Sequence, residues 1–381
     1  MAASSPGMSQ SGGLLSGWRG LARFWAAVLA LAVAGIVVLQ TLGPPPIFPV
    51  TEPIKPPTGP AARTDAVSAA PVPSQSKTTD GKAADAKPMD TSQQADLPLR
   101  PGRMTPGPIA DPDPAMLEPA AGASQALLPR ISIDGRAPMS AYAAGFDAST
   151  LRPRVGILIA GIGMSEADSM AAIKALPGGV TLAISPYADD IGRLLAAARS
   201  NEHEYLLSVP MEPQGYPAND PDDRSALMTS LPPAENLSRL QAILTRLTGY
   251  AGVTNALGPL HGERLASVAT QLDPVLQEIA RRGLLFVDVR TGQKVLPHVW
   301  NRSADMVLDD DPLDAAVLDQ RLDVLTHLAL DKGSALGIVS VPRPVTVERI
   351  AAWTNTLASK GLALAPVSAL VLPPAKQEPG K

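Results

Sequence analysis

The stretch that most constrains the fold of this 381-residue chain is residues 154–163, which read Arg-Val-Gly-Ile-Leu-Ile-Ala-Gly-Ile-Gly. A nearly continuous apolar run closed by glycines is typical of a strand that is buried on both faces of a sheet. Ser165 follows as a candidate helix N-cap, with Asp168 placed to complete a capping box. The stretch therefore predicts a first strand, a tight turn and a first helix.

Strand and helix patterns continue to alternate along the rest of the chain. Leucine recurs on one helical face within residues 237–247 and, with Ala329, within residues 318–329. Seven or eight alternations predict an α/β domain with a parallel sheet, either open and doubly wound or closed as a barrel. Glycines follow the helical patterns as C-terminal stops at Gly249, Gly283, Gly333 and Gly361. The predicted strands are Val155–Ala160, Val180–Ile184, Tyr205–Val209, Gly252–Asn255, Leu284–Asp288, Met306–Leu308, Leu336–Val341 and Leu362–Ala365.

Residues 24–42 form an uncharged apolar run of about the length that crosses a bilayer, roughly twenty residues. A buried globular helix is one alternative, but the proline-rich segment that follows offers nothing to cover it. A cleaved signal peptide is the other, although the run is long and no clean small-x-small site follows it. Arg19 and Arg23 place the N-terminal end in the cytoplasm. We therefore predict a cytoplasmic tail at residues 1–23, a single inner-membrane span at 24–42 and a periplasmic remainder.

Residues 43–150 lack hydrophobic periodicity and hold many of the chain's 40 prolines. Too little apolar surface is present to offset chain entropy, which predicts a flexible linker. Leu127, Leu128 and residues 131–133 are the one place where a short edge strand is expected. The folded domain is then predicted at residues 151–371, with a C-terminal tail at 372–381. A net charge of −4 gives no reason to expect nucleic-acid binding, and the absence of cysteine excludes disulfides and thiolate metal sites.

Short motifs follow the predicted strands in a recognisable order. They are Thr181–Ala188 (TLAISPYA), Pro210–Pro213 (PMEP), Asp288–Thr291 (DVRT) and Asp309–Pro312 (DDDP). Together they resemble the divergent polysaccharide deacetylase family of the carbohydrate deacetylase superfamily, over residues 154–370. The resemblance implies a distorted (β/α) barrel of about seven parallel strands. It also implies a chemistry in which a divalent metal, zinc, and a carboxylate base activate water against a sugar acetyl group. The implied partner is an acetylated polysaccharide of the cell envelope.

Three positions depart from the pattern of that family. Two adjacent aspartates usually end the first strand, where this chain has Ala160 and Gly161. The histidine of the fourth-strand motif is replaced by Ala256, and a Gly-His-Pro-type motif after the seventh strand is replaced by residues 340–342, Ser-Val-Pro. The resemblance therefore predicts that the usual metal site is lost. Zinc would bind only if a replacement site exists.

The polar residues that remain at the strand ends each have two interpretations. Glu212 and Asp288 are the candidate catalytic carboxylates, with bracing of loops as the alternative. The weak metal candidates are His261, Asp309 and Asp310, while Asp311 before Pro312 is typical of a helix N-cap. Ser208 and Ser340 have no His or Asp arrangement in the sequence that would make them nucleophiles. The candidate substrate-binding residues are Tyr187, Glu212, Asn255, Asp288 and Arg290.

Three hypotheses for function follow from these patterns. The first is a membrane-anchored periplasmic protein of envelope-glycan metabolism that resembles a deacetylase but lacks the usual metal site. The second is a non-catalytic scaffold that binds glycan or protein, and the third is an active deacetylase with a rearranged site. The sequence patterns do not decide whether the chain is an enzyme, because a fold alone does not establish function.

Overall fold

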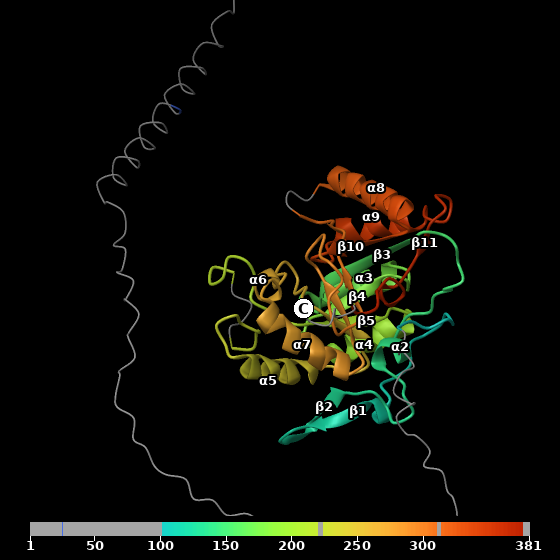
Figure 1. Ribbon diagram of the computed structural model, residues 1–381. Helices are drawn as coiled ribbons and strands as arrows, with labels where there is room; N and C mark the ends of the chain where they lie inside the picture. Colours follow the sequence, from blue (N-terminus) through green and yellow to red (C-terminus); the bar gives the residue numbers. More distant parts are fainter. Residues whose placement is uncertain (1–24, 26–100, 220–223, 311–313, 376–381) are drawn as a thin grey trace, which may run out of the picture. The chain divides into compact units, whose positions relative to one another are not determined.

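A computed structural model describes residue 25 and residues 101–219, 224–310 and 314–375 (Figure 1). The described residues from 101 onward belong to one compact unit. Among the described residues, no helix combines the length and the apolar character needed to cross a membrane. The predicted cytoplasmic tail and membrane anchor lie outside the described residues, apart from Trp25.

The unit is built on one parallel sheet, which confirms the predicted α/β class. Its strand order is β8-β7-β6-β5-β4-β3-β10-β9, and a short strand, β11, pairs with the start of β3. Each predicted strand corresponds to an observed one. The strands are β3 (Arg154–Ile162), β4 (Thr181–Ile184), β5 (Tyr205–Ser208), β6 (Gly252–Thr254), β7 (Leu285–Asp288), β8 (Asn301–Ser303), β9 (Met306–Val307), β10 (Ser334–Val339) and β11 (Ala363–Leu364).

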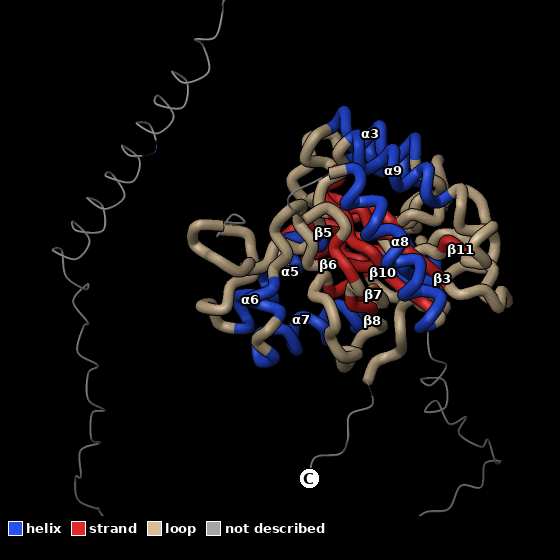
Figure 2. The backbone as a smooth tube through the Cα atoms, turned by 90° about the horizontal axis from the view of Figure 1, so that it is seen from above, coloured by secondary structure: helices blue, strands red, loops and turns tan. Residues whose placement is uncertain are grey.

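The sheet curls, so that its two edge strands are consecutive in the chain. Only Ala304 and Asp305 separate β8 from β9. The amide of Ala304 donates to the carbonyl of Asp288 after β7, and the amide of Asp305 donates to Leu336 in β10. A parallel sheet that curls in this way gathers the C-terminal ends of its strands at one end. Figure 2 shows the helices arranged around the outside of the curled sheet.

The helices begin and end largely where the sequence predicts. Ser165 caps the first major helix by accepting a hydrogen bond from the amide of Asp168. The four predicted stop glycines all have positive φ, between 68° and 79°. Asp314 caps α8, and the predicted cap at Asp311 lies outside the described residues. The helices are α2 (Pro138–Ala141), α3 (Glu166–Ala175), α4 (Ile191–Ser200), α5 (Pro233–Leu244), α6 (Glu263–Ala266), α7 (Ala269–Arg281), α8 (Ala315–Lys332) and α9 (Pro344–Thr354), with 3₁₀ turns η2 (Pro114–Met116) and η3 (Val367–Ala369).

Two apolar clusters lie on the two faces of the sheet, which is why β3 reads as a continuous apolar run. Ile157 and Ile159 of β3 pack outward with the helices. Leu158 and Ala160 point the other way and join an inner cluster with side chains such as Leu336. Successive side chains of a strand alternate between faces, so both sets of positions must be apolar here.

Residues 101–150 are folded, which corrects the prediction that the linker extends to residue 150. They contain η2, α2 and an antiparallel hairpin of β1 (Leu117–Ala120) and β2 (Ala123–Pro129). Met116, Met139 and Tyr142 are buried in the inner cluster. Leu127 and Leu128 lie in β2 as expected, but β2 pairs with β1 in a separate sheet. These few anchors are too widely spaced to give the periodicity by which a folded segment is recognised.

The hairpin is held to the domain by a buried arginine. The Arg282 guanidinium after α7 donates to Glu118 in β1 at 3.1 Å and to the carbonyl of Pro129 at 2.9 Å. The same guanidinium donates to Glu278 at 2.7 Å. Arg282 is almost fully buried, so these contacts satisfy a charge that would otherwise be costly to bury.

Candidate functional site

The loops that follow the parallel strands meet at one end of the sheet, which we call the mouth. It comprises residues 161–165, 185–190, 209–215, 255–263, 288–293 and 340–343. In α/β folds this end is where ligands and catalytic groups collect. All the site residues considered in the sequence lie at or next to this end.

The positions at which the resemblance implies two aspartates and a histidine offer no side-chain donor. Gly161 has a φ of +71°, and a Cβ placed there would lie 2.8 Å from the carbonyl oxygen of Ser340. Gly258, two residues after the histidine position, is also closely packed, since a Cβ placed there would lie 2.5 Å from the sulfur of Met164. Ala160 and Ala256 are fully buried in the inner cluster. The backbone of Ser340 therefore leaves no room for a side chain at position 161, and the side chains at positions 160 and 256 lie among apolar neighbours.

Glu212 braces two loops. One carboxylate oxygen pairs with Arg264 at 2.8 Å. The other accepts hydrogen bonds from the amide and the hydroxyl of Thr229, both at 2.6 Å. The side chain is buried, and both of its oxygens have partners inside the protein. The geometry therefore favours the bracing interpretation over a catalytic role for this carboxylate.

Asp288 is the centre of a second brace. Its fully buried carboxylate accepts from the backbone amide of Arg290 at 3.0 Å and from the guanidinium of the same residue at 2.6 Å. The side-chain Nδ2 of Asn255 donates to it at 3.3 Å, while the side-chain Oδ1 of Asn255 accepts from the backbone amide of Val289 at 2.9 Å. The structure thus brings together three of the predicted substrate-binding residues, and they are occupied with one another.

Asp309 holds the end of β10 in place. Its two carboxylate oxygens accept the backbone amides of Ser340 at 2.8 Å and Val341 at 3.0 Å. Asp310 is exposed, and its backbone carbonyl accepts from Arg321. Within the described ranges, no group of three or more His, Asp or Glu side chains is placed to hold a metal ion. The residues present at the mouth do not fit the zinc site that the resemblance implies.

His261 lies beside Ser340 and Glu263. The sequence did not suggest the contact with Ser340. The Nε2 atom of His261 is 3.2 Å from Oγ of Ser340, and Nδ1 is 3.5 Å from a carboxylate oxygen of Glu263. The expectation that Ser340 has no histidine partner is wrong, because folding brings together residues 79 positions apart. The one local signal is the pair His261 and Glu263, two residues apart in a loop at the mouth.

Glu263 is held as a carboxylate beside the imidazole of His261. Partial burial alone would raise the pKa of Glu263, but the interaction with His261 and the hydrogen bonds from the backbone amides of Glu263 and Gln214 outweigh it and lower that pKa. Glu263 is therefore a carboxylate at neutral pH, and it faces Nδ1 of His261. In the tautomer that carries its proton on Nδ1, Nε2 is an acceptor for the hydroxyl of Ser340.

Tyr187 is the most exposed of the candidate substrate-binding residues, with 41% of its surface accessible. It follows β4 and lines a polar pocket of about 530 Å³ beside α5. The other side chains of this pocket include the guanidinium groups of Arg224, Arg239 and Arg246. An exposed aromatic ring beside polar groups is suited to stack on a sugar and to fix its orientation.

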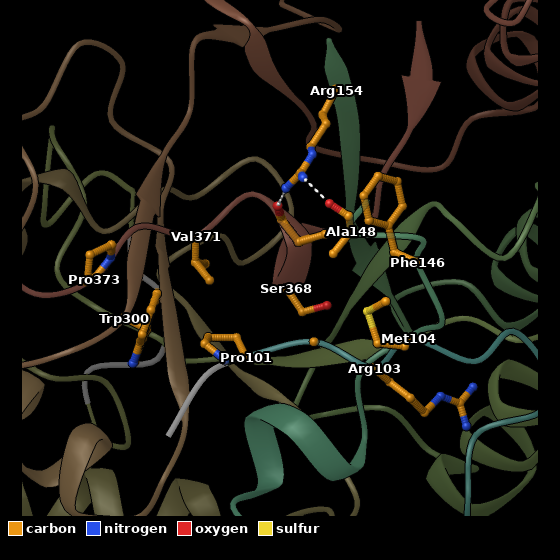
Figure 3. Close-up of a pocket in the computed structure, with 12 residues that line it drawn as sticks. Pro101, Arg103, Met104, Phe146, Ala148, Arg154, Trp300, Ser368, Val371 and Pro373 are labelled. Carbon is orange, nitrogen blue, oxygen red and sulfur yellow. Dashed lines mark hydrogen bonds between the residues drawn. The ribbon is translucent and has the colours of Figure 1, made fainter. Parts of the chain in front are cut away.

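A larger pocket, of about 630 Å³, lies at the start of β3, the end opposite the mouth. Figure 3 shows Arg154 and Phe146 on one side of this pocket and Trp300 and Pro373 on the other. The Arg154 guanidinium donates to the carbonyls of Ala369 and Ala148 and lies 5.1 Å from the centroid of the Phe146 ring. The lining has no carboxylate and no imidazole. This pocket therefore offers apolar surface without acid–base groups, and the mouth remains the candidate site.

Comparison with known proteins identifies a family and a similar solved structure. A family model described as divergent polysaccharide deacetylase matches residues 157–371. The crystal structure of an uncharacterized protein from Agrobacterium tumefaciens C58 is 32% identical, covers 64% of this chain and 99% of that chain, and superposes with a TM-score of 0.58. No curated protein matches the chain.

Proposed function

The chain belongs to the divergent polysaccharide deacetylase family, and from that premise we propose that it binds acetylated glycan of the cell envelope at its mouth. In this proposal the protein acts without the metal-dependent reaction that is typical of carbohydrate deacetylases. The family supplies the proposed substrate class, because the model that matches is described as a polysaccharide deacetylase. The residues of the mouth are the reason for proposing that the usual metal chemistry is absent.

The observation that carries the proposal is the closure of the metal positions. Hydrolytic metal sites in proteins normally need about three protein ligands and one open position. Here Gly161 and Ala256 offer no donor, and the carbonyl of Ser340 fills the space next to Gly161. Glu212, Asp288 and Asp309 are each engaged by internal donors. Recruiting them to a metal would break the braces that shape the loops.

The proposed location is the periplasm, with residues 24–42 as a single inner-membrane anchor. The support is the uncharged run and the arginines at its N-terminal side. We expect a reporter enzyme fused after Leu370 to be active only when it is a type that functions in the periplasm. Activity of a cytoplasm-dependent reporter at the same position would contradict this placement.

Tyr187 provides the test of glycan binding. We expect Tyr187→Ala to weaken binding of acetylated chito-oligosaccharide about fivefold, because a stacked aromatic contact is worth on the order of 1 kcal/mol. Tyr187→Phe keeps the ring and should retain most of the affinity. Isothermal titration calorimetry on the full-length protein measures both.

The matched control is Leu330→Ala, which removes an exposed apolar side chain from α8 on the outside of the sheet. This variant should bind glycan as the wild type does. If Tyr187→Ala and Leu330→Ala have the same dissociation constant as the wild type, the glycan does not contact the rim of the mouth after β4.

A further inference from the structure

We infer that Ser340, His261 and Glu263 form a hydroxyl–imidazole–carboxylate relay that hydrolyses O-acyl esters through an acyl-serine intermediate. The identity of the ester as an O-acetyl group on a glycan rests on the proposed function above. The relay itself rests on the geometry of the three side chains. It would give this member of the family an acyl-transfer chemistry that needs no metal.

The three side chains are placed in the order that such a relay requires. Oγ of Ser340 lies 3.2 Å from Nε2 of His261, within hydrogen-bond reach of the base. Nδ1 of His261 lies 3.5 Å from the Glu263 carboxylate, on the other side of the ring. The second distance is long for a hydrogen bond, but contacts of this kind often tighten only when substrate binds.

Ser340 is held at the inner side of the mouth. Leu336 and Ile338 of β10 pack in the inner cluster, and Ser340 follows them in the same alternation. Asp309 fixes the backbone amide of Ser340, and the glycine at 161 lets the Ser340 carbonyl approach closely. The nucleophile therefore sits on a braced backbone, which is what a precise reaction geometry needs.

The relay is sheltered from bulk solvent without being sealed. Ser340 has 8% of its surface exposed, and the side chain of His261 has 14%. Glu263 is held in turn by the amide of Gln214 at 3.4 Å and remains ionised, as its lowered pKa indicates. A sheltered imidazole with a fixed carboxylate on one nitrogen is a better base toward a hydroxyl on the other.

The reaction proceeds in two balanced steps. Oγ of Ser340 forms a bond to the ester carbonyl carbon while its proton passes to Nε2 of His261. The bond between that carbon and the sugar oxygen breaks, and the sugar hydroxyl leaves with the proton from His261. Water then attacks the acyl-serine, gives a proton to His261, and releases acetate and the free serine, which recovers its proton from His261.

The test uses the full-length protein with a fluorophosphonate probe and with p-nitrophenyl acetate. We expect the probe to label Ser340, located by mass spectrometry of the peptides, and EDTA to leave ester hydrolysis unchanged. Ser340→Ala and His261→Ala should lower kcat/KM by about 100- to 10,000-fold. Glu263→Gln should lower it less and should shift the pH profile, which a purely structural role would not do.

Two variants serve as controls. His327→Ala on α8 and Ser359→Ala after α9 remove an exposed histidine and an exposed serine whose hydrogen bonds go to the backbone carbonyls of Asp323 and Thr356. Both should label and hydrolyse as the wild type does.

An unlabelled Ser340 in the folded wild-type protein would overturn the relay, and so would hydrolysis that EDTA abolishes. Neither result depends on the stability of a variant. Binding of acetylated chito-oligosaccharide without labelling would leave the proposed function standing and remove only the relay. Labelling of Ser340 without glycan binding would keep the relay and remove the glycan as its substrate.

Discussion

Gly161→Asp, which introduces an acidic residue that the family resemblance implies at this strand end, is expected to destabilise the domain by about 2–4 kcal/mol and to create no zinc site. Two costs add. The φ of +71° is unfavourable for aspartate, and the new Cβ would lie 2.8 Å from the carbonyl oxygen of Ser340. Because that neighbour is backbone, relief requires the end of β10 to move against its brace with Asp309. Urea unfolding of wild type and variant measures the loss.

Gly292→Asp is the matched control for this substitution. Gly292 has a φ of +69°, but nothing lies within 4 Å of a Cβ placed there. Its cost should be the backbone strain alone, about 1 kcal/mol. The difference between the two variants therefore isolates the collision with the Ser340 carbonyl.

The same samples test the metal directly. Neither wild type nor Gly161→Asp should retain zinc after purification without added metal, and micromolar Zn²⁺ should not raise the melting temperature of either. Stoichiometric zinc in the wild type would contradict the proposal that the metal chemistry is absent. A Gly161→Asp variant that binds zinc and is as stable as the wild type would show that the strand end has room for a ligand.

The sheet was predictable because its strands carry their information locally. β3 is buried on both faces, so nearly every residue from Val155 to Ile162 is apolar, and such a run has few other uses in a soluble domain. The stop glycines were equally local, since a helix that ends in a left-handed residue favours glycine there. The curl of the sheet was implied only by resemblance, because closure depends on which strands become neighbours.

Two parts of the molecule were not predictable, because they depend on contacts between residues that are distant in the sequence. The contact between His261 and Ser340 joins loops that are far apart in the sequence and leaves no spacing to recognise. Folding of residues 101–150 depends on isolated side chains, such as Tyr142, that find partners elsewhere in the domain. In both cases the deciding interactions are tertiary, and no local pattern encodes them.

Glu204 is a partner that holds residues 101–150 to the rest of the domain. It is fully buried just before β5, and the amide of Ala144 donates to its carboxylate at 3.0 Å. Thr181 donates through its hydroxyl at 2.9 Å, and Ser368 donates through both its amide and its hydroxyl. One carboxylate thus joins the N-terminal segment, the start of β4 and η3.

We expect Glu204→Ala to lower the free energy of unfolding by about 3–5 kcal/mol, because it leaves several buried donors without an acceptor as well as a cavity. Glu204→Gln keeps the volume but turns one acceptor into a donor that faces other donors, so it should cost less than alanine and still more than 1 kcal/mol. Urea unfolding measures both losses. Glu348→Ala, which removes an exposed glutamate of α9, should stay within about 0.5 kcal/mol of the wild type.

Limited proteolysis adds a readout that global stability alone does not give. Under native conditions the wild type should yield a fragment that retains residues 101–150, whereas Glu204→Ala should be cut within that range before the parallel sheet is degraded. The reason is that Glu204 holds the amide of Ala144, while the sheet keeps its own hydrogen bonds and both apolar clusters. Equal protection of residues 101–150 in the two proteins would mean that apolar packing of Met116, Met139 and Tyr142 is sufficient to hold the segment. Cleavage of that range in the wild type would restore the linker boundary at residue 150.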